Sequence, residues 1–232
     1  MSRKTAPAVY TIPPHRAFAD ALVSGVLATH GDDRMAMARG IILVPNNRAG
    51  LSIRDAFVRR SEGGLLLPRL VTVGDVESDE GAGLVFDGAE ADPIPPAVAP
   101  LQRQLILARL IQQQAAFTGH MPADQAMRLA ADLAHVLDQL LIERIDPAKL
   151  RDVADEALSA HWQTSLQTLG IILEAWPKEL AALEAIDLAD RRNRQLAQTA
   201  TRWRETPPPG FVIAAGVSTA APAIADLMRC VA

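Results

Sequence analysis

The order of apolar and polar residues predicts that strands alternate with helices at both ends of the chain. Continuous or β-prone apolar runs predict strands at Val9–Ile12, Ile41–Val44, Leu65–Val73 and Phe211–Ala215. Apolar residues at helical spacing predict helices at Phe18–Leu27, Leu51–Arg60 and Pro222–Val231. This alternation is typical of an α/β fold, in which helices cover a parallel sheet, here of about four strands.

The middle of the chain has a different pattern. Apolar residues recur at helical spacing from Leu101 to about Arg204, and the helices expected there are Leu101–Phe117, Met127–Arg144, a leucine-rich stretch at 166–183 and Leu188–Glu205. We therefore expect an α/β domain at residues 1–97, an all-helical insertion at residues 98–206 and a return to the α/β domain at residues 207–232. Because the last predicted helix runs to the end of the sequence, we expect the chain to be the front part of a longer protein.

The charge balance changes the picture of what the chain can bind. Its 23 basic and 27 acidic residues give a net charge of −4, which is unusual for a nucleic-acid-binding protein. Seven of the acids, and no lysine or arginine, lie between Asp75 and Asp92. We interpret the stretch at about 75–97 as a solvated acidic linker rather than a set of metal ligands. The rest of the chain is weakly basic, so nucleic-acid binding stays open.

The composition narrows the class of protein in two further ways. A single cysteine, Cys230, excludes a disulfide framework and a multi-cysteine metal site within these residues. No apolar run approaches the roughly 18 residues of a membrane span. Pro13 and Pro14 interrupt the N-terminal apolar stretch too early for a signal peptide. We expect a cytoplasmic protein without membrane contact.

A parallel sheet binds ligands beyond the carboxyl ends of its strands, so the residues after each predicted strand are candidates for chemistry. A nucleotide-binding loop after the first strand needs glycines, a lysine and a serine or threonine. The residues there are Pro13, Pro14, His15 and Arg16. Prolines have no backbone N–H to donate to a phosphate. The last strand ends in Ala214 and Ala215 rather than in acids that could hold magnesium, so the sequence predicts neither nucleotide binding nor ATP hydrolysis.

The second predicted strand runs into Pro45-Asn46-Asn47-Arg48-Ala49. This strand–turn–helix segment resembles motif Ia of superfamily-one helicases, which lies against the backbone of single-stranded DNA. In that comparison residues 13–16 occupy the Walker A position and residues 214–215 the Walker B position. More closely, the chain resembles the N-terminal part of the AddB family, the second subunit of bacterial AddAB helicase–nucleases, in its alphaproteobacterial form. The segments that carry the resemblance are 9–14, 42–49, 65–69 with 74–76, and 212–216.

The resemblance implies a P-loop-helicase-like α/β domain whose motor is inactive, at the front of an ATP-dependent helicase/deoxyribonuclease subunit. It also implies a C-terminal nuclease domain with an iron–sulfur cluster, neither of which can be placed on residues of this chain. We therefore expect no cofactor here. Family members act with an AddA motor subunit in recombinational repair of DNA double-strand breaks, and their inactive core scans for a Chi-like sequence. The implied role is a non-catalytic segment that holds the DNA strand and docks an AddA-like motor.

The candidate DNA contacts are Asn46, Asn47 and Arg48 in the motif Ia-like turn, and Arg191, Arg194 and Arg202 on the last insertion helix. Side chains and a helix N-terminus can hold phosphates in such places. The alternative for the turn is an ordinary strand-to-helix connection, and the alternative for the arginines is a solvated helix face. We interpret the three tryptophans as core anchors rather than base-stacking platforms, namely Trp162, Trp176 and Trp203.

Two functions of other classes stay open at this point. A self-contained α/β enzyme acting on a small molecule needs a nucleophile or an acid–base pair at a strand end, and the candidates there are Ser218, Thr219 and His15. A protein-interaction domain without a nucleic-acid role needs no such residues.

Overall fold

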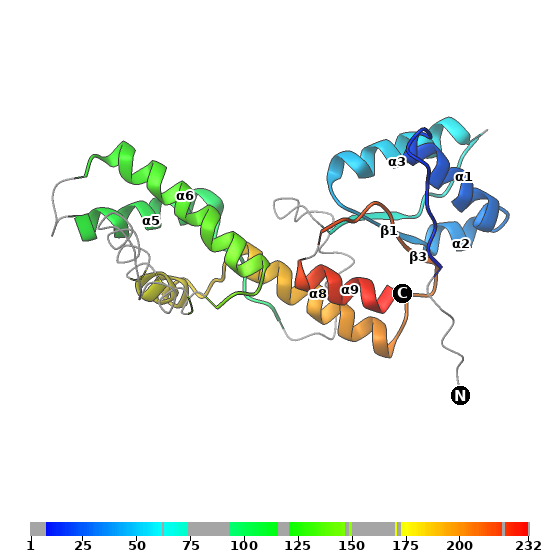
Figure 1. The fold of residues 1–232 in the computed structure, drawn as a ribbon. Coiled ribbons are helices and arrows are strands. Elements are labelled where there is room, and N and C mark those ends of the chain that lie inside the picture. The colour runs from blue at the N-terminus through cyan, green and yellow to red at the C-terminus, as the bar shows by residue number, and fades with distance from the viewer. Residues whose placement is uncertain are drawn as a thin grey trace. The chain divides into compact units, whose positions relative to one another are not determined.

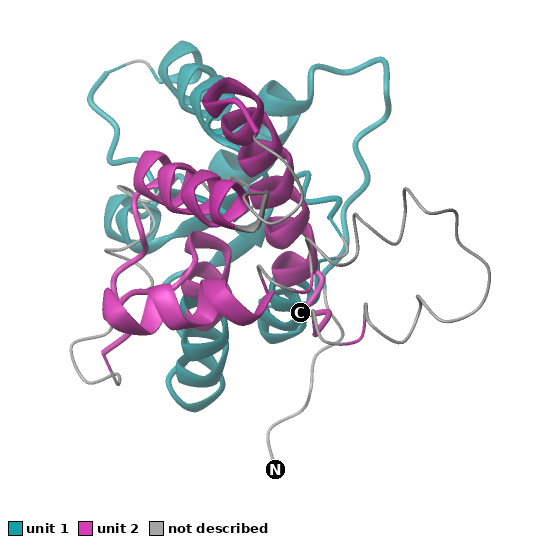
Figure 2. Cartoon of the chain, turned by 90° about the vertical axis from the view of Figure 1, so that its left-hand side faces the viewer, with its two compact units in different colours: residues 1–92, 195–232 teal, residues 93–194 magenta. Residues whose placement is uncertain are grey.

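The computed structural model describes residues 8–61, 63–73, 93–115, 121–146, 149, 170, 173–219 and 221–231. The chain divides into two compact units, residues 1–92 with 195–232 and residues 93–194 (Figure 2). The second unit begins and ends earlier than the insertion expected at residues 98–206. The predictions for Asp75–Asp92, for Trp162 and for most of the leucine-rich stretch before residue 173 lie outside the described residues.

The first unit is an α/β domain with a three-stranded parallel sheet in the order β2-β1-β3 (Figure 1). The strands are β1 (Ile41–Val44), β2 (Arg69–Thr72) and β3 (Val212–Ala214). In the register, Leu43 of β1 lies between Val71 of β2 and Ala214 of β3. All four residues of β1 are buried, as a continuous apolar run in a central parallel strand requires. The α/β class and the parallel sheet predicted from the sequence are confirmed.

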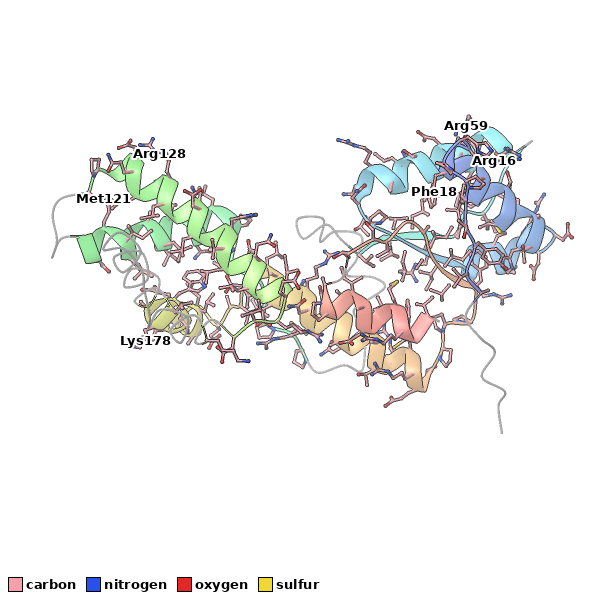
Figure 3. The ribbon with its side chains drawn as sticks, in the orientation of Figure 1. Arg16, Phe18, Arg59, Met121, Arg128 and Lys178 are labelled. Atoms are coloured by element: carbon pink, nitrogen blue, oxygen red, sulfur yellow. The ribbon has the colours of Figure 1, made fainter. Side chains whose placement is uncertain are left out.

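Helices cover both faces of this sheet (Figure 1). They are α1 (Phe18–His30), α2 (Arg34–Arg39), α3 (Asn47–Arg60) and, on the other face, α9 (Pro222–Val231). Val23 of α1 and Phe57 of α3 are fully buried in one cluster with Ile42 of β1. Arg59 of α3 forms an ion pair of 2.8 Å with Asp20 of α1, so charge joins the same two helices at their surface (Figure 3).

The first helix runs back along β3. At its start, the ring of Phe18 lies within 3.4 Å of the point where a side chain on Gly216 would begin. At its end, the His30 ring stacks on Phe211 with centroids 4.2 Å apart. Gly216 follows β3 with φ of 67°, a left-handed conformation that favours glycine. Because Phe211 precedes β3 and Gly216 follows it, α1 is antiparallel to that strand.

Two predicted strand segments are not strands. Residues 8–13 have no regular secondary structure, and Val9 and Tyr10 are 84% and 88% exposed. Leu65–Leu67 also lack strand pairing, and β2 begins only at Arg69, directly after Pro68. The described residues therefore contain three strands rather than four. A β-prone run becomes a strand only where a neighbour pairs with it, and proline cannot donate to the ladder.

The second unit is helical. Its elements are α5 (Pro100–Ala115), α6 (Ala123–Ile142), a helical run at residues 173–182 and the start of α8 (Leu188–Glu205). Leu107 of α5, Leu137 of α6 and Trp176 share one buried core. A parallel bridge between Ala97 and Ile186 joins the beginning of this unit to its end.

A charged cluster is buried beside that core. Nε of Arg103 lies 2.9 Å from Oδ1 of Asp187, and Nη1 of Arg103 lies 2.7 Å from Oδ1 of Asp138. The indole N–H of Trp176 donates to Oδ2 of Asp187 over 3.0 Å. The Arg103–Asp187 contact is poorly aligned, and within the described residues Nε and Nη2 of Arg103 have no hydrogen-bond acceptor. The two charges therefore compensate each other through proximity more than through hydrogen bonding.

Candidate nucleic-acid interface

The candidate site lies at the carboxyl edge of the sheet in the first unit. All three strands are parallel, so the residues that follow them leave the sheet at this edge. Backbone pairing continues one residue further on both sides of β1, where Val73 N–H donates to Val44 and Ala215 N–H donates to Leu43. The turn after β1 therefore starts from a fixed position in the middle of the edge.

The turn after β1 begins α3 and is closed by a side-chain cap. Asn46 has an extended backbone, and its Oδ1 accepts a 2.9 Å hydrogen bond from the N–H of Ala49. Asparagine is a preferred N-cap for this reason. The cap uses one acceptor of Asn46 and one of the N–H groups that a helix start leaves unpaired. Asn46 thus has a structural role in the turn.

Asn47 and Arg48, the next two residues, are exposed in the first turn of α3. Their backbone N–H groups belong to the positive end of the helix, which favours an anion. Among the described residues, neither Arg48 nor Arg54 of the same helix has a carboxylate partner, whereas Arg59 pairs with Asp20. The start of α3 therefore presents cationic side chains together with the positive end of the helix.

An open groove of about 510 Å³ leads away from this turn. Asn47, Leu51 and Arg54 of α3 form one side of it, and residues around β2 form the other, namely Leu67, Pro68, Leu70 and Thr72. Leu51, the first residue of the helix predicted at Leu51–Arg60, is half exposed. Its spacing of four residues from Asn47 and three from Arg54 places all three on one helix stripe. This stripe, rather than the turn alone, is what the sequence reasoning missed.

The groove combines two kinds of surface. Its leucines and proline give apolar walls that can pack against a sugar or a base, and Arg54 and Asn47 give donors for phosphate oxygens. Single-stranded nucleic acids are bound by this combination of a cationic track and apolar contacts. The arrangement holds no group of carboxylates, cysteines or histidines suited to a metal, and none occurs among the other described residues.

Residues 13–16, which were predicted to follow a first strand, form an exposed turn. Arg16 N–H donates to the carbonyl of Pro13 over 3.0 Å, and Pro14 and His15 lie within this turn. The helix that follows, α1, begins without a side-chain cap. In the described part of the chain, no strand precedes this turn. The prediction that these residues follow a first strand is therefore wrong.

The end of β3 carries small residues. Ala214 is exposed, and Ala215 is 3% exposed and packed in the core of the unit. Further on, Oγ1 of Thr219 accepts a 3.2 Å hydrogen bond from the N–H of Ala221 at the start of α9, while Ser218 is exposed. Thr219 thus has a local structural role, and among the described residues no hydrogen bond joins Ser218 or Thr219 to a histidine.

The arginines of α8 are engaged within the chain. Arg194 forms a two-point contact with Asp190 one turn earlier, with distances of 2.7 and 3.3 Å. Arg191 and Arg202 also have interaction partners in the structure. Each of the three arginines therefore has an interaction partner within the chain. Trp176 and Trp203 are buried, which agrees with their interpretation as core anchors.

Comparison with known proteins gives no assignment. No protein family, no curated protein and no solved structure matches the chain. No helix in the described ranges combines the length and apolarity needed to cross a bilayer.

Proposed function

We propose that this chain is a non-catalytic, helicase-like segment of a cytoplasmic DNA repair helicase–nuclease subunit. Its role is to hold a DNA strand and to dock a motor subunit of the AddA kind during recombinational repair of double-strand breaks. The observation that carries the proposal is the exposed pair Asn47–Arg48 at the start of α3, beyond the carboxyl end of the central strand.

The groove beside α3 supports the DNA-binding part. A strand whose phosphate lies at the positive end of α3 can continue past Leu51 towards Arg54. Few cations contribute, so the electrostatic part of the binding is small and sensitive to salt. This agrees with a chain that supplies one wall of a larger DNA channel.

Two other features support the non-catalytic part. ATP hydrolysis needs a phosphate cradle and a carboxylate that holds magnesium. At the two corresponding places the chain has the proline turn at residues 13–16 and the small residues Ala214 and Ala215. Neither set supplies a cradle or a carboxylate.

The place of the helical unit supports the family resemblance. The chain leaves the sheet after β2, forms the unit at residues 93–194, and returns through α8 to β3 beside β1. A helical insertion within the first α/β domain is what the resemblance implies. A separate subunit can dock on surfaces of either unit, and the proposal assigns that partner to the AddA-like class.

The proposal is tested by titrating the chain with a fluorescent single-stranded oligonucleotide at several salt concentrations, together with an ATPase assay. We expect weak binding that decreases with salt and no ATP turnover. Turnover by the purified chain would contradict the inactive core. Absence of binding even at low salt would favour the protein-interaction alternative.

A further inference from the structure

We draw no further inference here: the strongest candidate, the open apolar groove that exposed Leu101, Leu105 and Leu183 line beside α5 in the second unit, carries no proposal because nothing in the described part of the chain shows what covers it.

Discussion

Oδ1 of Asn46 accepts a 2.9 Å hydrogen bond from the backbone N–H of Ala49, and this bond separates the residues of the turn by role. Asn46 closes the start of α3, while Asn47 and Arg48 are exposed beside it. A motif that appears in the sequence as three adjacent candidates thus becomes one structural residue and two residues able to touch a ligand.

Replacing the cap tests this division. Asn46→Ala should lower the free energy of unfolding of the first unit by about 1 kcal/mol, because the Ala49 N–H loses its acceptor. Asn46→Ser keeps an oxygen for the cap and should retain most of that stability. Urea denaturation measures both. If Asn46→Ser weakened DNA binding as much as the loss of Arg48 does, Asn46 would be a direct ligand instead.

Close backbone packing predicts a second effect in the same unit. A Cβ on Gly210 would overlap the carbonyl of Arg39, which is backbone and cannot move aside, so Gly210→Ala should destabilise strongly. A Cβ on Gly40 would overlap the Phe211 ring, which is a side chain. Gly40→Ala should therefore also destabilise the unit. Adding Phe211→Ala to this variant should partly relieve the overlap and so recover some of the lost stability. Thermal unfolding of the single and double variants measures the coupling.

A matched glycine supplies the control for these substitutions. Gly25 lies inside α1, and a Cβ there would meet no atom within 4 Å. Gly25→Ala should stabilise by roughly 0.5–1 kcal/mol, because alanine loses less backbone freedom in a helix. Equal melting temperatures for the Gly25 and Gly210 variants would contradict the packing seen around Gly210.

The buried ion pair in the second unit predicts a large effect of one carboxylate. Asp187→Ala should cost about 3–5 kcal/mol, because it leaves the buried guanidinium of Arg103 without its buried carboxylate partner. Asp190→Ala, in a more exposed pair with Arg194 on the same helix, should cost only about 0.3–0.5 kcal/mol. Denaturation followed by the fluorescence of buried Trp176 compares the two variants. Similar costs would mean that the Arg103 cluster is not a buried pair in solution.

The same carboxylate predicts a pH dependence. Burial raises the pKa of Asp187 above its usual value, and nearby Arg103 offsets this only in part. The folded state then holds the proton more readily than the unfolded state. The stability that Asp187 contributes is therefore present at acid pH and is lost as pH rises through its raised pKa. Against an Asp187→Asn variant, the wild type should lose urea resistance as the pH rises above the usual pKa of an aspartate.

In the first unit, the pKa of the Asp33 carboxylate is shifted in the opposite direction. N–H groups of Ala36 and Met35 donate to Asp33 and lower its pKa. Its contribution is present above its usual pKa and is lost as pH falls through the lowered value. An Asp33→Asn variant should therefore reduce the acid sensitivity of the first unit, whereas a larger acid sensitivity in that variant would contradict the cap.

The sequence predicts the elements whose signals are local. β1 coincides with the continuous apolar run at Ile41–Val44, and α8 coincides with the helix expected at Leu188–Glu205. The short helix α2 was not predicted, because its sequence signals are limited to one capping residue, Asp33, and one buried residue, Met37. The opposite error occurs at Val9–Ile12, where a strand was predicted and none forms. Residues with strand propensity do not form a strand without a neighbouring strand to pair with.

The candidate site was also predictable only in part from the sequence. The turn at residues 46–48 follows from a strand end and a helix start, which are both visible in the sequence. The groove was not predictable, because it depends on β2 placing Leu67 and Leu70 opposite Leu51 and Arg54. The ion pair between Arg194 and Asp190 was predictable from their spacing of four residues on a helix. The sequence analysis considered only the arginines of this helix and did not include the acid.

The most direct test of DNA binding at the start of α3 is the salt dependence of single-stranded DNA binding by the wild-type chain and by Arg48→Ala. Each phosphate contact on a single strand contributes about 0.7 to the slope of log affinity against log salt. We expect Arg48→Ala to weaken binding and to lower this slope by about 0.7. Arg60→Ala removes the same charge from the far end of α3 and should leave both quantities unchanged. An unchanged affinity and slope in Arg48→Ala would contradict the placement of DNA at this turn.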